Sequence, residues 1–253
     1  MKTTPSGDDA ERKRVQDDIT NYGCHIIMIN DDGYLPGFVY TIGLFERFQQ
    51  PEIICFGLKT EVQAALLNHA CDLMKQGEQI VSGKLYTGFL EGYTIQFVEV
   101  AKDYYQYYVG YGGWYYGMTW DFPVLQLVWP DKQSLFTWEA GFNPNWKFKQ
   151  PLLDRNTDCM FYEPLDLAVL TTRQAFEGEP ILYVYHDEDG AWQFLTRLEP
   201  DNADIKLVAL SEITRLDLAI NQIHQLSYGW RAWRVDRHSE WVMEEVDPKA
   251  QEE

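Results

Sequence analysis

The sequence lacks the features of a membrane protein, a secreted protein or a nucleic-acid-binding protein. No apolar run reaches the roughly 18 residues that a membrane-spanning helix needs. Residues 1–18 are polar and of mixed charge, without the apolar stretch of a secretory signal. Only 21 Lys and Arg oppose 39 Asp and Glu, and a net charge of −18 disfavours contact with phosphates or anionic lipids. We therefore expect a cytoplasmic protein that binds neither nucleic acid nor a membrane.

Signatures of metal, cofactor and nucleophile chemistry are also missing. The cysteines form no CxxC pair, which predicts free, buried thiols in a reducing compartment; they are Cys24, Cys55, Cys71 and Cys159. The five histidines show no metal-binding spacing such as HExxH, and no P-loop or GxSxG elbow occurs. We predict no metal, no cofactor and no catalytic activity.

Hydrophobic periodicity predicts an α+β protein with two domains, each a mostly antiparallel sheet with one or two packed helices. Residues 60–75 carry apolar side chains at helical spacing, with Thr60 as the N-cap. Short apolar runs predict strands; they cover residues 24–29, 38–43, 53–56, 93–100, 122–129, 167–170, 181–185, 192–195, 229–235 and 240–243. A second helix is expected at residues 210–220.

The chain divides into four predicted segments. Residues 1–19 form a polar lead-in, residues 20–154 a first α+β domain, residues 155–245 a smaller second domain and residues 246–253 an acidic tail. Residues 1–154 hold 12 Lys and Arg against 19 Asp and Glu, a net charge of −7. Residues 155–253 hold 9 against 20, a net of −11. The acidity is therefore concentrated in the second part, where it would attract a basic protein partner.

Residues 104–120 are exceptionally aromatic, with seven tyrosines and two tryptophans among interleaved glycines. Tyr with Gly is typical of protein-binding loops, although a segment folded over its own core would have the same composition. Under the first interpretation the partner-binding residues are Tyr104, Tyr105, Tyr107, Tyr108, Tyr111, Trp114 and Tyr115. A rival contact is the acidic hairpin turn formed by Asp187, Glu188 and Asp189, which Gly190 completes.

A third possibility is a pocket in the first domain that binds a small molecule or carries out acid–base chemistry. His25 lies in an apolar strand, and Asp121 precedes a buried run in an aromatic setting. Tyr40 and Thr41 come from the next strand. His25 cannot activate its neighbour Cys24 directly, because successive strand residues point to opposite faces.

Two motifs, PGFVYTIGL at residues 36–44 and DFPVLQLVWPD at residues 121–131, resemble a widespread bacterial domain family of unknown function. The resemblance covers about residues 20–154 and implies no activity; Cys24 stands where that family usually has Trp. Residues 160–245 are similar to small immunity-type domains of bacterial toxin loci, through AVLTT at residues 168–172 and GAWQF at residues 190–194. This resemblance implies an immunity protein that binds and occludes the toxic domain of a cognate secreted effector. The acidic charge of the chain leads us to expect that this toxic domain is basic.

Overall fold

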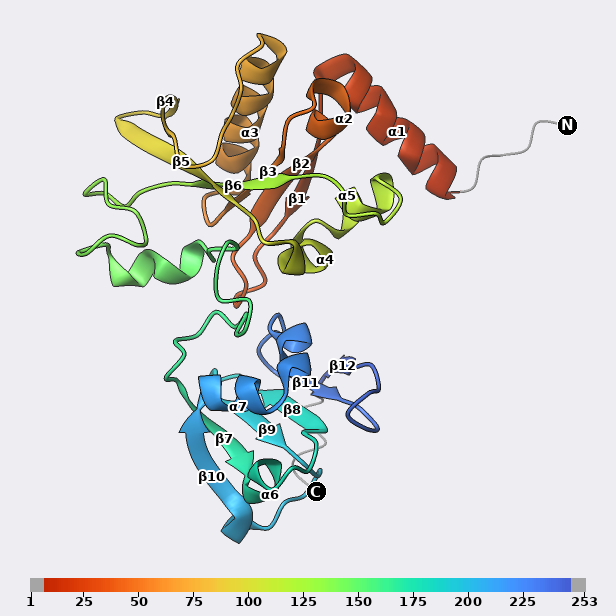
Figure 1. The fold of residues 1–253 in the computed structure, drawn as a ribbon, viewed down its shortest axis with the longest axis vertical. Coiled ribbons are helices and arrows are strands. Elements are labelled where there is room, and N and C mark those ends of the chain that lie inside the picture. The colour runs from red at the N-terminus through yellow and green to blue at the C-terminus, as the bar shows by residue number, and fades with distance from the viewer. Residues whose placement is uncertain (1–6, 247–253) are drawn as a thin grey trace, which may run out of the picture. The chain divides into compact units, whose positions relative to one another are not determined.

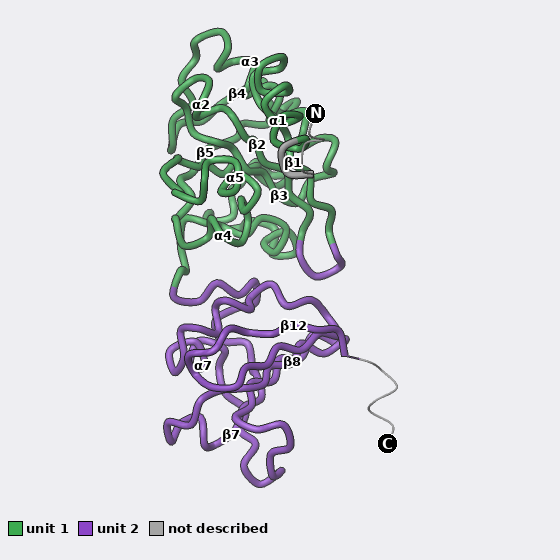
Figure 2. Tube along the Cα trace, turned by 90° about the vertical axis from the view of Figure 1, so that its right-hand side faces the viewer, with its two compact units in different colours: residues 1–31, 36–157 green, residues 32–35, 158–253 purple. Residues whose placement is uncertain are grey.

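The structure of the protein, a computed structural model, describes residues 7–246. They form two compact units (Figure 2): residues 7–31 with 36–157 make unit 1, and residues 32–35 with 158–246 make unit 2. The predicted lead-in is described from Gly7 onward, where helix α1 (Gly7–Tyr22) begins. The predicted acidic tail lies outside the described residues except for Val246.

Unit 1 is built on a six-stranded mixed sheet with the order β1-β2-β3-β6-β5-β4 (Figure 1). Its strands are β1 (His25–Ile29), β2 (Phe38–Ile42), β3 (Glu52–Phe56), β4 (Leu85–Leu90), β5 (Tyr93–Glu99) and β6 (Val124–Val128). β3 and β6 are parallel, and the other neighbours are antiparallel. The first two predicted strands are present as β1 and β2, which pair antiparallel with His25 opposite Ile42.

Helices cover both faces of this sheet (Figure 1). α3 (Thr60–Lys75) buries its apolar stripe against Val39 and Ile53 of the sheet. On the other face Phe38 and Phe56 meet Tyr108, because neighbouring strand residues alternate in direction. The remaining helices are α2 (Leu44–Phe48), α4 (Tyr105–Tyr108), α5 (Gly110–Tyr115) and the 3₁₀ helices η1 (Lys102–Tyr104) and η2 (Pro144–Lys149).

Unit 2 has its own six-stranded mixed sheet, with the order β10-β7-β9-β8-β11-β12. The strands are β7 (Ala168–Thr172), β8 (Tyr183–His186), β9 (Trp192–Leu195), β10 (Ile205–Ala209), β11 (Trp230–Trp233) and β12 (Val242–Glu245). β7 and β9 are the parallel pair. The helices are α6 (Arg173–Phe176), α7 (Leu210–Leu216), η3 (Asn202–Asp204) and η4 (Leu218–Ile223).

The loop between β1 and β2 contributes one aromatic side chain to unit 2. The Tyr34 ring lies 4.6 Å from the His186 ring and 5.7 Å from the Tyr162 ring. Asp32 accepts a hydrogen bond of 2.6 Å from the Ser227 hydroxyl. Unit 2 is therefore assembled from two separate stretches of the chain.

The predicted α+β class with two sheet-containing domains is confirmed, and so is the helix at residues 60–75. The prediction of Thr60 as its N-cap is wrong: Thr60 is the first helical residue, and Lys59 is the N-cap without a side-chain capping bond. The strands predicted at residues 229–235 and 240–243 are present as β11 and β12, which pair antiparallel. Strands β4 and β10 were not predicted, because most of their side chains are exposed or half-buried and give no apolar run. The helix expected at residues 210–220 was too long: α7 ends at Leu216, since Asp217 has extended backbone (φ −148°, ψ 99°).

Arg234 is a fully buried cation in unit 2. Its guanidinium donates to the Ile181 carbonyl at 2.9 Å, forms an ion pair with Asp217 and lies 4.3 Å from the Trp241 ring centroid. A buried cation is tolerated only while its partner remains.

We expect Asp217→Asn to lower the free energy of unfolding of unit 2 by about 3 kcal/mol, because the substitution leaves the Arg234 charge uncompensated. Asn retains the side-chain oxygen that caps η4, so the loss of stability reports on the ion pair and not on the cap. The measurement is hydrogen exchange under increasing urea, resolved by peptide.

The matched control is Glu244→Gln, which removes the partner of the half-exposed Arg231. It should cost less than about 1 kcal/mol. Equal effects of the two substitutions would contradict the assignment of Arg234 as a buried, dependent charge.

Candidate functional site

The acidic turn predicted at residues 187–190 connects β8 and β9. Gly190 adopts a left-handed conformation (φ 86°) that favours glycine. The Asp187 carboxylate accepts from the Gln193 amide at 2.7 Å, and the Asp189 carboxylate accepts from the Ala191 N–H at 3.1 Å. Glu188 and Asp189 are exposed. These two bonds hold the Asp187 and Asp189 carboxylates in place, and Glu188 and Asp189 present negative charge at the surface.

Two exposed aromatic side chains adjoin this turn. The Gly229 N–H donates to the His186 carbonyl at 2.8 Å, which brings the segment before β11 against the hairpin. A Cβ atom on Gly190 would lie 3.5 Å from Tyr228, and one on Gly229 would lie 3.5 Å from Glu188. Tyr228 is 44% exposed and Trp230 is 36% exposed.

We call this surface the acidic-aromatic patch; it comprises Glu188, Asp189, Tyr228, Trp230 and Glu245. Glu245 belongs to it because it lies opposite Trp230 in the pairing of β11 with β12.

A buried aromatic stack supports the patch from below. His186 stacks on Trp192 with ring centroids 3.9 Å apart, and the Tyr228 ring lies 4.6 Å from His186. His186 Nδ1 lies 2.6 Å from the Leu226 carbonyl oxygen, so this nitrogen carries the proton and donates. Burial lowers the pKa of His186, which keeps the ring neutral near pH 7. The exposed Tyr228 ring therefore packs on this buried stack.

The patch carries negative charge without a cation of its own. In the described part of the chain, no Lys, Arg or His lies within 4.0 Å of the carboxylates of Glu188, Asp189 or Glu245. Exposed aromatic rings beside carboxylates that lack a cationic partner form a surface suited to Lys or Arg side chains of a partner.

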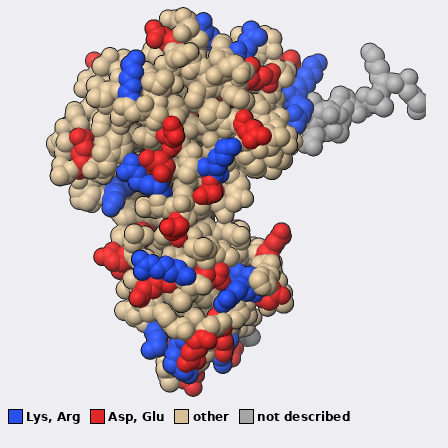
Figure 3. Space-filling view, viewed as in Figure 1, with Lys and Arg blue, Asp and Glu red and all other residues tan. Residues whose placement is uncertain are grey.

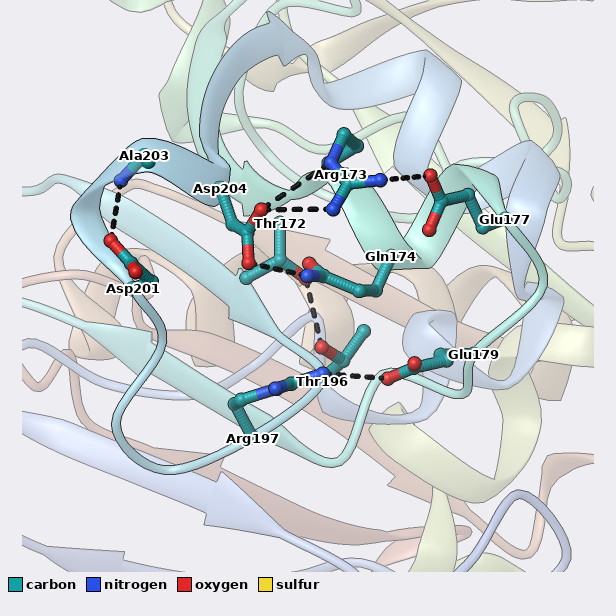
Figure 4. A network of polar contacts seen from close by, with 10 residues as sticks. All are labelled: Thr172, Arg173, Gln174, Glu177, Glu179, Thr196, Arg197, Asp201, Ala203 and Asp204. Carbon is teal, nitrogen blue, oxygen red and sulfur yellow. Dashed lines mark hydrogen bonds and ion pairs between the residues drawn. The ribbon is translucent and has the colours of Figure 1, made fainter.

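The acids around α6 are compensated by arginines. Around α6 (Figure 4), Arg173 pairs with both Glu177 and Asp204, and Arg197 pairs with Glu179 at 3.2 Å. On the face of the molecule in Figure 3, acidic and basic side chains are likewise interspersed over unit 2. Uncompensated charge therefore distinguishes the patch from the α6 network, although both are acidic in sequence.

The aromatic segment at residues 104–120 is packed largely into unit 1. Four of the predicted contact residues are buried, namely Tyr104, Tyr105, Tyr108 and Tyr115, whereas Tyr107, Tyr111 and Trp114 are half-buried. The Tyr115 hydroxyl donates to Glu46 at 2.8 Å. Arg12 of α1 lies 4.5 Å from the Trp114 ring centroid and donates to the carbonyls of Trp114 and Tyr115. A partner could touch only the half-buried members without unfolding the segment.

The four residues of the predicted pocket have separate surroundings. His25 is buried and lies 2.7 Å from the Asp18 carboxylate, and Tyr40 is buried in β2. Thr41 donates to Glu52, as described below. Asp121 is exposed and pairs with Lys102 at 3.6 Å. Asp121 lines an open cavity of about 910 Å³, which the other three residues do not line.

Glu52 is the polar centre of unit 1, and the sequence analysis did not single it out. Its side chain is buried, and it accepts from the Thr41 hydroxyl at 2.7 Å and the Tyr116 hydroxyl at 2.6 Å. The backbone N–H groups of Gly43 and Phe45 donate to it at 2.9 and 3.1 Å. Burial raises the pKa of Glu52, while these four donors favour the charged form.

The neighbouring phenol is held protonated. Burial and the Glu52 carboxylate raise the pKa of Tyr116, so its hydroxyl donates rather than ionises. One feature of the sequence could have pointed to a buried Glu52. The dipeptide Pro51-Glu52 places a carboxylate at the start of a strand, among apolar neighbours where a charged residue is unexpected.

Comparison with protein families identifies part of unit 1. A model of the family described as "Domain of unknown function (DUF4262)" matches residues 18–143.

Residues 18–143 are a DUF4262 domain. The domain covers the whole sheet of unit 1, including Glu52 and the aromatic segment. No curated protein and no solved structure matches the chain. Within the described residues, no helix is long and apolar enough to cross a membrane.

We expect Glu52→Gln to lower the free energy of unfolding of the DUF4262 domain by about 2 kcal/mol, because the amide nitrogen of Gln would face donors that now bind a carboxylate. Hydrogen exchange resolved by peptide separates this loss from unit 2. Glu46→Gln is the control, since Glu46 is exposed and accepts only from the Tyr115 hydroxyl and the Gln16 amide among the described contacts. A Glu52 variant as stable as the Glu46 variant would argue against a carboxylate held by four donors.

Proposed function

We propose that the protein acts by binding another protein, as an immunity protein that occludes the toxic domain of a cognate secreted effector. The observation that carries this proposal is the acidic-aromatic patch, where exposed carboxylates and exposed rings lie together. The similarity of residues 160–245 to immunity-type domains supports the same function. The patch lies within that region of the sequence.

The chemistry of the patch favours a basic partner. Trp and Tyr supply much of the binding energy in protein interfaces, chiefly when a well-packed surround excludes water. The carboxylates steer a cationic surface into contact and accept hydrogen bonds from Lys or Arg. Toxic domains that act on nucleic acids or nucleotides need basic surfaces, and an acidic inhibitor complements them. Inhibition by occlusion requires shape and charge complementarity and no chemistry in the inhibitor.

Small-molecule binding by unit 1 is a second candidate, favoured by the cavity of about 910 Å³ beside the start of β3 and β6. Its lining combines Asp121, Lys102 and Glu99 with the Tyr105 ring. A thermal-shift screen of metabolites against the native chain and Asp121→Asn tests it. Shifts that are absent, or equal in both proteins, would count against a ligand held by Asp121.

We expect co-expression of this protein to restore the growth of cells that produce the toxic domain encoded beside its gene, and the two proteins to co-purify. Trp230→Ala should weaken the complex at least about 10-fold, because an interface anchor is lost. Glu188→Lys should slow association and flatten its dependence on salt. Binding is measured by surface plasmon resonance at several ionic strengths.

Glu199→Lys is the matched control, because this exposed acid lies beyond the opposite end of the β8–β9 hairpin. It makes the same charge change outside the patch and should retain native affinity. If the patch variants bind as tightly as the control, the patch is not the contact. If the native protein neither protects nor co-purifies, the immunity function itself is refuted.

A further inference from the structure

Two of the four cysteines form a pair in the core of unit 1. Cys24 directly precedes β1, and Cys71 lies in α3. Both are buried in the same hydrophobic cluster, and their thiols are hydrogen-bonded to each other.

The backbone before Cys24 passes directly over Cys71. Gly23 has a left-handed conformation (φ 92°), and a Cβ atom there would lie 3.0 Å from Cys71 Sγ and 2.6 Å from Lys75 Cε. Cys71 Sγ also lies 3.6 Å from the Tyr22 carbonyl oxygen. Only a residue without a side chain leaves room for this approach of sulfur to backbone.

The environment makes the two thiols unequal. The hydrogen bond from the Cys24 thiol lowers the pKa of Cys71, and the Lys75 ammonium one helical turn further on lowers it as well. Cys71 and burial together raise the pKa of Cys24. Cys71 is thus the thiol that more readily becomes the nucleophilic thiolate, and Cys24 is the donor beside it.

The other two cysteines lack these features. Burial raises the pKa of Cys55 and of Cys159, and no second thiol takes part in their described interactions. They serve as internal references for the chemistry of an isolated buried thiol.

We propose that Cys24 and Cys71 form a peroxide-reactive site, in which Cys71 is oxidised and Cys24 converts the product to a disulfide. The Cys71 thiolate attacks one oxygen of hydrogen peroxide, the O–O bond breaks, and hydroxide leaves; Cys71 becomes a sulfenic acid. Cys24 sulfur then attacks the sulfenic sulfur, its proton passes to the departing hydroxyl, and water is released. The two sulfurs lose two electrons in total, and peroxide gains them.

Access to the pair favours a small oxidant. Both cysteines are buried, and the flexible side chain of Lys75 packs against Gly23 beside them, with its ammonium 2.9 Å from Asp72. Movement of this side chain opens a path for peroxide, but a bulky disulfide reagent would require displacement of backbone. The resulting disulfide between Cys24 and Cys71 would link the junction of α1 and β1 covalently to α3.

The experiment treats the full native chain with hydrogen peroxide, blocks remaining thiols under denaturing conditions and maps disulfides without reduction. A peptide linking Cys24 to Cys71 is expected, and dithiothreitol should remove it. Cys55 and Cys159 should remain alkylatable over the same period. No linked peptide, or equally fast loss of the Cys55 and Cys159 thiols, would overturn the proposal.

The roles within the pair are tested with Cys24→Ser and Cys71→Ser, with Cys55→Ser as the control for serine in the same core. In Cys24→Ser, the sulfenic acid should accumulate on Cys71 and react with dimedone. In Cys71→Ser, Cys24 should take up no dimedone. The reverse labelling would overturn the assigned roles, and the native chain still tests the site if a variant fails to fold.

Discussion

The buried carboxylate of Glu52 is the interaction on which the architecture of unit 1 depends. It joins the end of β2, the first turn of α2 and the residue after α5 through one group. Gly43 lies at the left-handed N-cap of α2, and its N–H has no partner within that helix. The carboxylate satisfies this donor and fixes the chain reversal between β2 and α2. The cost of desolvating a charge is offset only because four donors converge on it.

The buried Glu52 carboxylate also positions part of the dense aromatic packing of unit 1. Tyr116 is held by Glu52, and its ring lies 4.7 Å from Phe122 at the entry to β6. Gly113 packs face to face against the Trp120 ring, where a side chain would clash. The glycines among the tyrosines therefore let rings approach backbone. The composition that resembles a binding loop is largely explained by packing within the domain.

Local patterns predicted much of the fold, because helix α3 and the hairpins are encoded by periodicity and turn residues close in sequence. The acidic turn at residues 187–190 was identified for the same reason. Tyr228 and Trp230 were not connected with it, since about 40 residues separate them and only strand pairing brings them together. Glu52 was missed because its donors come from three segments. Sites assembled by tertiary contact leave no short-range pattern to read.

The Tyr34 ring has a consequence for the modularity of the chain. A cut between residues 157 and 158 would separate the two sheets but would leave unit 2 without the aromatic ring that packs on His186 and Trp192. The polypeptide enters unit 2 twice, first as four residues and later as a continuous domain. Unit 2 is therefore not a continuous segment of the chain that could be moved intact into another protein. A chain that carried residues 158–246 alone would lack the Tyr34 ring and would have an incomplete aromatic core.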